Sequence, residues 1–188
     1  MNVLRWVAGA LLVATAAGAA ALEVVRERNP ETGLWVYKAK GEGFSIELIQ
    51  LHARFIRATY GSKGFTPEML DQAASYCTFG TIARNLSDHP VSYRVADWRA
   101  ITPDGTRHPL KTKTEWLQDW QAAGVPFNWS ILPDSPTFQA GDWAQGFTTV
   151  KLPRDSSFDL EISWTVGDQQ HVGVIEDMEC PPELLARD

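Results

Sequence analysis

The stretch FDLEISWTV, residues 158–166, decides the fold, because apolar and polar side chains alternate along it without a break. A β-strand points successive side chains to opposite faces, so this pattern predicts a strand with one face in a core and one face in water. The buried face carries Phe158, Leu160, Ile162, Trp164 and Val166, and the wet face carries Asp159, Glu161, Ser163 and Thr165. One buried and one solvated face is typical of antiparallel sheets.

Further short strands are expected on both sides of this stretch. FSIELIQL (44–51) alternates in the same way, and β-type segments follow at 78–86, 91–101, 144–153 and 171–179. Asp104-Gly105 marks a hairpin turn, since both central positions of such a turn favour positive φ. Many short strands separated by turn residues predict a mainly β fold of two packed antiparallel sheets.

Helical patterns interrupt the strands twice. In TPEMLDQAASYC (66–77), Thr66 is a suitable N-cap and Pro67 a suitable first helical residue, and with the preceding segment this predicts a helical hairpin at about 51–77. TKTEWLQDWQAAGV (112–125) predicts one further helix, capped by Thr112 or Thr114. We therefore expect a Trp-rich helical insertion at about 112–143.

The strand and turn pattern also points to a family. RNLSDHPVSYRVADWRAITPDGT (84–106), FQAGDWAQGFTTVKLP (138–153) and FDLEISW (158–164) resemble exported bacterial immunoglobulin-like domains. In those domains an N-x-S-x-x-P-V turn precedes a strand, and a D-G turn and an A-G-D or P-G-E turn come before a long strand. The resemblance covers residues 78–176 and implies an antiparallel immunoglobulin-like β-sandwich, but no chemistry.

The first residues have the layout of an export signal. One cation, Arg5, precedes an uncharged run at 6–21 that ends in small residues, and Ala19 and Ala21 form an A-x-A site with cleavage expected before Leu22. An uncleaved anchor is the alternative, and the run is short for it, because a span needs about 20 strongly apolar residues. We expect a signal peptide at 1–21, a single domain at 22–188, a periplasmic location and no membrane span after cleavage.

Composition and cysteine number narrow the function. The net charge of -6 argues against a nucleic-acid partner, which requires a basic surface. The chain has two cysteines, Cys77 and Cys180, and an even pair in an oxidising compartment is expected to form a disulfide. Cys77 would end a helix, where the dipole disfavours a thiolate, and G-x-S-x-G is absent from the sequence, so no enzyme is predicted.

A metal site is an alternative use of the cysteines, because soft sulfur together with imidazole suits copper. The spacing includes neither C-x-x-C nor H-x-x-x-H, and oxidation would remove the thiolates as ligands, so no metal and no cofactor are predicted. The residues that could act as ligands are His52, Met69, Cys77, His89, His108, His171, Met178 and Cys180.

The aromatic residues provide the remaining indication of function. The chain has eight tryptophans, and four of them, Trp116, Trp120, Trp129 and Trp143, fall in the predicted insertion. Such side chains dominate binding hot spots, and the alternative is that they pack the insertion onto the sandwich. We expect an exported, non-catalytic binding protein of the bacterial envelope, with an envelope protein or a small ligand as partner. A periplasmic copper chaperone or storage protein and a carbohydrate-binding module are the alternatives.

Overall fold

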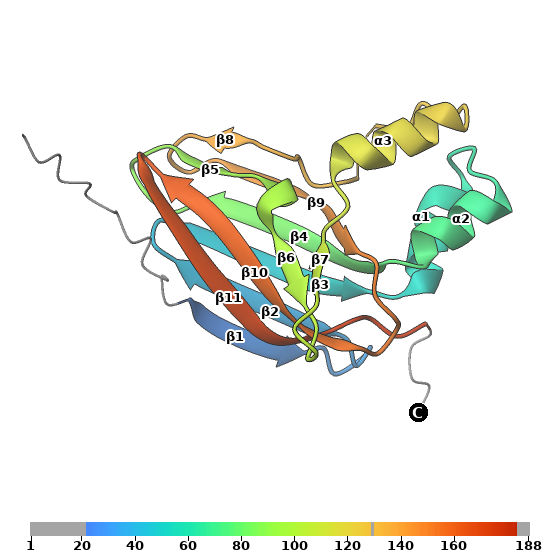
Figure 1. The fold of residues 1–188 in the computed structure, drawn as a ribbon. Coiled ribbons are helices and arrows are strands. Elements are labelled where there is room, and N and C mark those ends of the chain that lie inside the picture. Colours follow the sequence, from blue (N-terminus) through green and yellow to red (C-terminus); the bar gives the residue numbers. More distant parts are fainter. Residues whose placement is uncertain (1–21, 129, 184–188) are drawn as a thin grey trace, which may run out of the picture.

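The computed structural model describes residues 22–128 and 130–183, so the predicted signal peptide and Trp129 lie outside the described residues. In this part of the chain, eleven β-strands form two antiparallel sheets and three α-helices gather at one end of them (Figure 1). The predicted mainly β fold, with two antiparallel sheets in a sandwich-like arrangement, is therefore confirmed.

The first sheet has five strands in the order β1-β2-β3-β4-β9, and every neighbouring pair is antiparallel. Its first four strands follow one another along the chain, and β9 joins the far edge after a long excursion. The strands are β1 (Glu23–Arg28), β2 (Trp35–Gly41), β3 (Phe44–Leu51), β4 (Cys77–Asn85) and β9 (Trp143–Val150).

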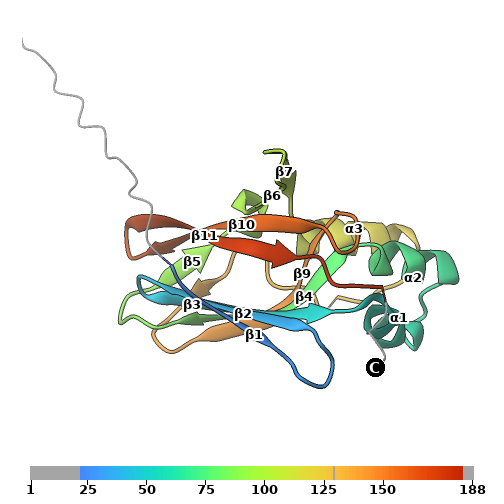
Figure 2. The ribbon, with the colours of Figure 1, turned by 90° about the horizontal axis from the view of Figure 1, so that it is seen from below.

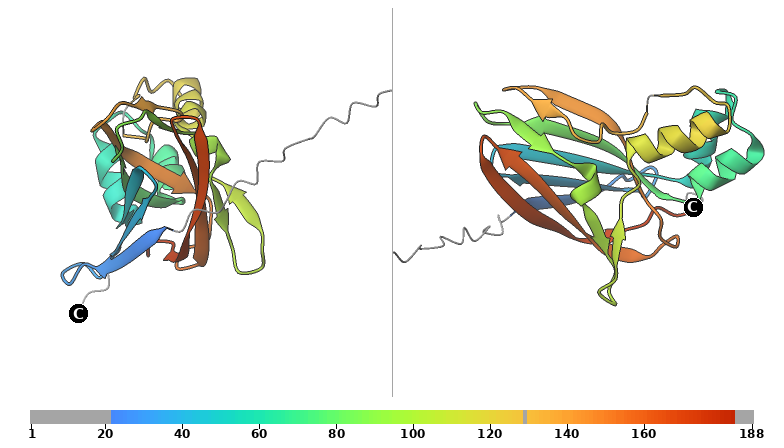
Figure 3. Two further views of the ribbon diagram at one scale, coloured as in Figure 1. Left: turned by 90° about the vertical axis from the view of Figure 1, so that its left-hand side faces the viewer. Right: turned by 45° about the horizontal axis from the view of Figure 1, so that its top comes forward.

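The second sheet is built around β10 (Ser157–Val166), the strand that the alternating stretch predicts. One edge of β10 pairs with β11, and the other edge is shared by β6 and β5. The β6–β7 hairpin adds to the edge of β10, with β7 as the outer strand (Figure 3). The other strands are β5 (Val91–Tyr93), β6 (Arg99–Ile101), β7 (Arg107–Pro109), β8 (Thr137–Phe138) and β11 (Gln169–Glu179).

The segment 91–101 differs from its prediction as one strand. A 3-10 turn, Val95–Asp97, divides it into β5 and β6, and both pieces pair with the same edge of β10. The turn is followed by Trp98, whose ring is fully buried and whose Nε1 donates to the Ser163 carbonyl at 3.1 Å. The 3-10 turn thus accompanies the burial of Trp98, because an unbroken alternation that starts with Val91 on the inner face would place residue 98 on the outer face.

The main core lies between the two sheets, which Figure 2 shows edge-on as two layers. Four of the five apolar side chains predicted for the inner face of β10 are buried, and Val166 is partly buried against the same core. The largest fully buried side chains in this core are Tyr37, Phe44, Ile46, Leu48, Trp98, Leu132, Ile162, Trp164, Ile175 and Met178.

The predicted helices are present at the expected places. The hairpin consists of α1 (Ala53–Gly61) and α2 (Pro67–Ala74), and α3 (Lys113–Ala122) is the further insertion (Figure 1). Thr66 caps α2, and Thr112 forms a capping box with Glu115 at the start of α3, which settles the choice between Thr112 and Thr114. Among the described residues, no helix is both long and apolar enough to cross a bilayer.

Strand β1 is not among the strands that the sequence pattern predicts. The segment EVVRER lacks an apolar face and most of it is exposed, yet it pairs with β2 over its whole length. Charged side chains of this kind protect an edge strand against pairing with other chains. Arg26 of β1 also binds Asp177 and the Glu176 carbonyl of β11, across the two sheets.

The two cysteines lie at disulfide distance, with their Cα atoms 5.0 Å apart. Cys77 begins β4 in the five-stranded sheet, and Cys180 follows β11 of the six-stranded sheet. Both side chains are buried. The bond therefore joins the two layers close to the end of the sandwich that carries the helices.

Candidate binding surface

The outer face of the five-stranded sheet is covered by helices along only part of its length. Near the helical end, Thr78 and Thr149 point outward but are buried beneath α1, α2 and α3. Trp116 of α3 closes this contact, because its Nε1 donates to Thr149 Oγ1 at 2.8 Å in a buried hydrogen bond. A space of only about 10 Å³ remains there, so this half of the face is sealed.

Two of the four predicted binding tryptophans belong to this sealed half. Trp116 and Trp120 are 2% and 3% exposed, and their rings lie 5.5 Å apart in a second aromatic core. In this structure Trp116 and Trp120 pack the insertion onto the sandwich, which is the alternative to a binding surface that the sequence left open, because the apolar side of α3 faces the sheet. Tyr60 and Phe65 complete the same cluster, and Trp129 lies outside the described residues.

Trp143 behaves differently, since 53% of its surface is exposed. It begins β9, and its neighbour Ala144 packs against the main core, so Trp143 points to the outer face of the sheet. Its cross-strand partner is Arg84, whose guanidinium carbon lies 5.7 Å from the centre of the indole ring. Of the predicted binding tryptophans that the structure describes, Trp143 is thus the accessible one.

Strand register aligns polar side chains in a row across this uncovered half. Glu23 pairs with Lys40, Lys40 with Ser45, Ser45 with Arg84, and Arg84 with Trp143. Directly paired residues of neighbouring strands point to the same face, so the five side chains stand side by side. We call them the Lys40 row.

A second row runs parallel to the first, one step closer to the helices. It consists of Val25, Lys38, Glu47, Ile82 and Gln145, and we call it the Lys38 row. The members of the two rows that lie on β1, β2, β3 and β4 line a hollow of about 360 Å³ that opens to solvent, which we call the open trough. Trp143 and Gln145 lie beside its β9 end.

The charges of the open trough are arranged unevenly. Lys38 binds Glu27 at 2.7 Å, and this hydrogen bond is the main reason that the pKa of Lys38 is raised. Lys40, Glu47 and Arg84 form no ion pair with any residue in the described part of the chain. Glu23 also lines the trough and forms no ion pair with a described residue, so the trough offers two cations and two carboxylates that a ligand can engage without breaking an ion pair.

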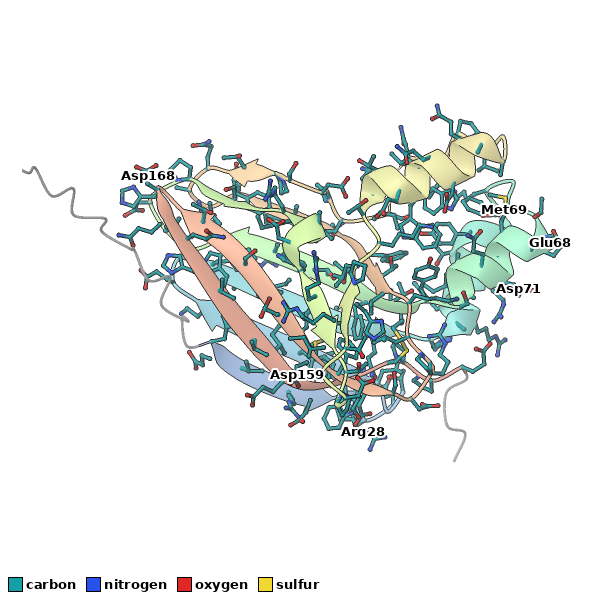
Figure 4. All side chains as sticks on the ribbon, viewed as in Figure 1. Arg28, Glu68, Met69, Asp71, Asp159 and Asp168 are labelled. Carbon is teal, nitrogen blue, oxygen red and sulfur yellow. A yellow bond between two sulfur atoms is a disulfide. The ribbon has the colours of Figure 1, made fainter. Side chains whose placement is uncertain are left out.

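The residues considered as metal ligands are scattered. Met69 lies on α2 at the helical end (Figure 4), while His171 is on β11 and stacks on Trp164 with ring centres 5.5 Å apart. His52 caps α1 by accepting from the Phe55 amide, and burial lowers its pKa. The disulfide takes both thiols, and no group of three or more His, Cys, Asp or Glu side chains in the described residues is arranged to hold a metal ion.

Lys40, Ser45, Glu47 and Arg84 are not among the site residues that the sequence predicts. The strand alternation already places Ser45 and Glu47 on a wet face, but it does not say which residues of β2 and β4 stand beside them. That information comes from the strand register, which pairs residues about 40 positions apart, such as Ser45 with Arg84.

The fold and the open trough define an antiparallel two-sheet protein with one partly uncovered, polar sheet face. No family model matches the chain, and no curated protein matches it. Among solved structures, it is similar to a Bacillus subtilis protein whose structure is described as that of a "putative lipoprotein", with 7% sequence identity and a TM-score of 0.36. The match covers 84% of this chain, which spans 34% of the other protein.

Proposed function

We propose that this protein is an exported, non-catalytic binding protein of the bacterial envelope and that its ligand occupies the open trough. The observation that carries the proposal is the half-covered outer face of the five-stranded sheet. Helices seal one half of this face, and the other half presents a hollow of about 360 Å³ next to an exposed tryptophan. Concave sites with an aromatic side chain and a few polar groups are the usual form of ligand sites.

The distribution of pKa shifts supports a role in binding rather than in catalysis. Burial raises the pKa values of Tyr37 and Tyr60 to about 12, and both hydroxyls lie inside the protein. Strongly shifted groups gathered in a cleft would favour an active site. Tyr37 and Tyr60 serve the interior instead, since Tyr37 accepts from the Glu179 amide and Tyr60 bonds to Ser130, and neither residue lines the open trough. Lys38 does line the trough, and its pKa is raised by its hydrogen bond to Glu27.

Export and periplasmic location belong to the same proposal. Their support is the signal-like composition of residues 1–21 and the buried cysteine pair, which suits an oxidising compartment. The N-terminal sequence of protein recovered from the periplasm tests this part. A first residue of Leu22 is expected, and a full-length chain in the membrane fraction would contradict it.

The immunoglobulin-like relationship is also part of the proposal. Its support comes from the turns that carried the resemblance: Gly105 and Gly141 both adopt positive φ, as the D-G and A-G-D turns require. Asn85 organises the N-x-S turn by donating to the His89 carbonyl at 2.7 Å. A crystal structure whose strands differ in order and position from those of immunoglobulin-like domains would contradict the relationship.

A carbohydrate ligand is the candidate that one observation favours, namely the exposed ring of Trp143 among side chains with hydrogen-bonding groups. The proposed function is tested with an array of envelope glycans, peptides and small molecules. Binding should be lost in Trp143→Ala and retained in Phe55→Ala, a matched variant in an aromatic residue on α1 that is 43% exposed. If no ligand depends on Trp143, the open trough is not the binding site.

A further inference from the structure

We propose that the Lys40 row binds the carboxylate of an acidic sugar, a uronate unit of a glycan, while Trp143 stacks on a sugar ring. This inference rests on the proposed function and specifies its ligand. It comes from the alignment of two unpaired cations, a hydroxyl and an exposed aromatic ring on one side of the sheet.

The cations flank a small side chain. Ser45 stands between Lys40 and Arg84, and neighbouring strands lie about 4.8 Å apart, so the two cationic residues are separated by about 10 Å at the backbone. Both side chains are long and exposed. The Arg84 guanidinium rests against the Trp143 ring in the free protein, and a change of its rotamer would bring it over the short Ser45 side chain beside Lys40. A carboxylate seated above Ser45 could accept from the hydroxyl, the ammonium and the guanidinium together, and charge-assisted hydrogen bonds of this kind are the strong ones.

The neighbouring Lys38 row discriminates between anionic ligands. Glu47 lies there between Lys38 and Ile82, and it accepts no hydrogen bond from another described residue. A carboxylate in this position repels a simple anion but accepts hydrogen bonds from hydroxyl groups. A uronate carries both groups, because its carboxylate suits the Lys40 row and its ring hydroxyls suit Glu47. Glu23, next to Lys40, adds a second acceptor at the β1 end.

Trp143 supplies the apolar part of the site. Sugar rings present an apolar C–H surface, and an aromatic side chain with half of its surface exposed offers a flat partner for it. Arg84 lies beside this ring, so the indole stands next to the two cations of the Lys40 row. The stacked ring and the charged group of the ligand would therefore occupy adjacent positions along the row.

The composition of the trough argues against an acidic protein partner. The centres of protein interfaces are depleted of charged residues, and their hot spots lie in fully desolvated pockets. The two rows instead contain five charged side chains in neighbouring positions, and Val25 and Ile82 are the aliphatic members of the rows. A hydroxyl-rich ligand can bind these groups without leaving them desolvated and unpaired.

The test uses the mature protein and three probes in calorimetric titrations: oligogalacturonate, its methyl ester and poly-glutamate. The ester keeps the rings but loses the charge, and poly-glutamate keeps the charge but lacks the rings. Oligogalacturonate should bind, and Lys40→Gln or Arg84→Gln should each weaken it about tenfold or more. Arg54→Gln, a matched exposed cation on α1, should leave the affinity unchanged.

Each other outcome has a defined meaning. Equal binding of the methyl ester, still dependent on Trp143, would overturn the acidic-sugar inference but keep the trough as a ligand site. Equal binding of poly-glutamate would overturn it in favour of an acidic peptide. Failure of oligogalacturonate to bind would overturn the inference by itself, and the array with Trp143→Ala decides separately whether the proposed function also fails.

Discussion

Opening the Cys77–Cys180 disulfide should cost this protein a large part of its stability. The two cysteines are 103 positions apart, so the bond closes most of the chain between the predicted cleavage site and the last described residues. In the chain-entropy model, a loop of this length lowers the entropy of the unfolded chain enough to contribute about 4.7 kcal/mol at 25 °C. Small domains are stable by only about 5–15 kcal/mol, so the loss is a considerable fraction of the total.

The assay is equilibrium unfolding in urea of the oxidised protein, the reduced protein and the Cys77→Ala/Cys180→Ala variant. Reduction keeps both buried sulfur atoms, whereas the variant removes them, so the pair separates the cross-link from side-chain packing. We expect both to lose about 3–5 kcal/mol in the free energy of unfolding. A loss below about 1 kcal/mol on reduction, with a large loss in the variant, would refute the cross-link reasoning.

Four further outcomes are expected. In thermal unfolding, Trp116→Ala should cost about 3–5 kcal/mol because it empties a buried site, while Trp143→Ala should change stability by less than about 0.5 kcal/mol; similar losses would contradict the separation of buried and exposed tryptophans. Gly146→Ala should destabilise by about 1–3 kcal/mol or more, since its Cβ would lie 2.4 Å from the Leu132 backbone nitrogen, and Gly61→Ala, with nothing within 4 Å, is the control. Burial raises the pKa of Tyr60 to about 12, so the neutral hydroxyl contributes stability that is fully present below its ordinary pKa of 10.0 and is lost as the pH rises through 12. Absorbance titration of the folded protein, with denaturation measured at each pH, tests this. Ionisation of Tyr60 near pH 10 in the folded protein would contradict it. Cu(I), Cu(II) and Zn(II) should leave the melting temperature unchanged, and a rise would restore the metal-handling alternative.

The layers of the fold were predictable because they depend on local patterns. Strand alternation at residues 158–166 correctly separates the inner from the outer face of β10, and the N-cap residues Thr66 and Thr112 mark where α2 and α3 begin. The N-terminal strand β1 was not predictable in this way. Its sequence has no apolar face, and pairing with β2 rather than burial holds it in place.

The tryptophans show where sequence reasoning reaches its limit. The sequence does not tell which of Trp116, Trp120 and Trp143 are exposed and which pack in a core, because this depends on where α3 docks. Helical spacing puts Trp116 and Trp120 on one side of α3, but whether that side meets water or the sheet is a tertiary property. Trp143 stays exposed because the helices end before they reach its part of β9.

The division of one sheet face into a sealed and an open half also separates stability from binding. Side chains between the helices and the sheet, such as Trp116 and Thr149, are held by buried hydrogen bonds and ring contacts, so their replacement would lower stability whether or not they had a role in binding. Lys40 and Arg84 are exposed and form no ion pair in the described part of the chain, and the ring contact of Arg84 is to the exposed Trp143, so their removal should leave the core unchanged. Loss of affinity without loss of stability in these variants would therefore report on the ligand contact itself, and a matching loss of stability would show that the row supports the fold instead.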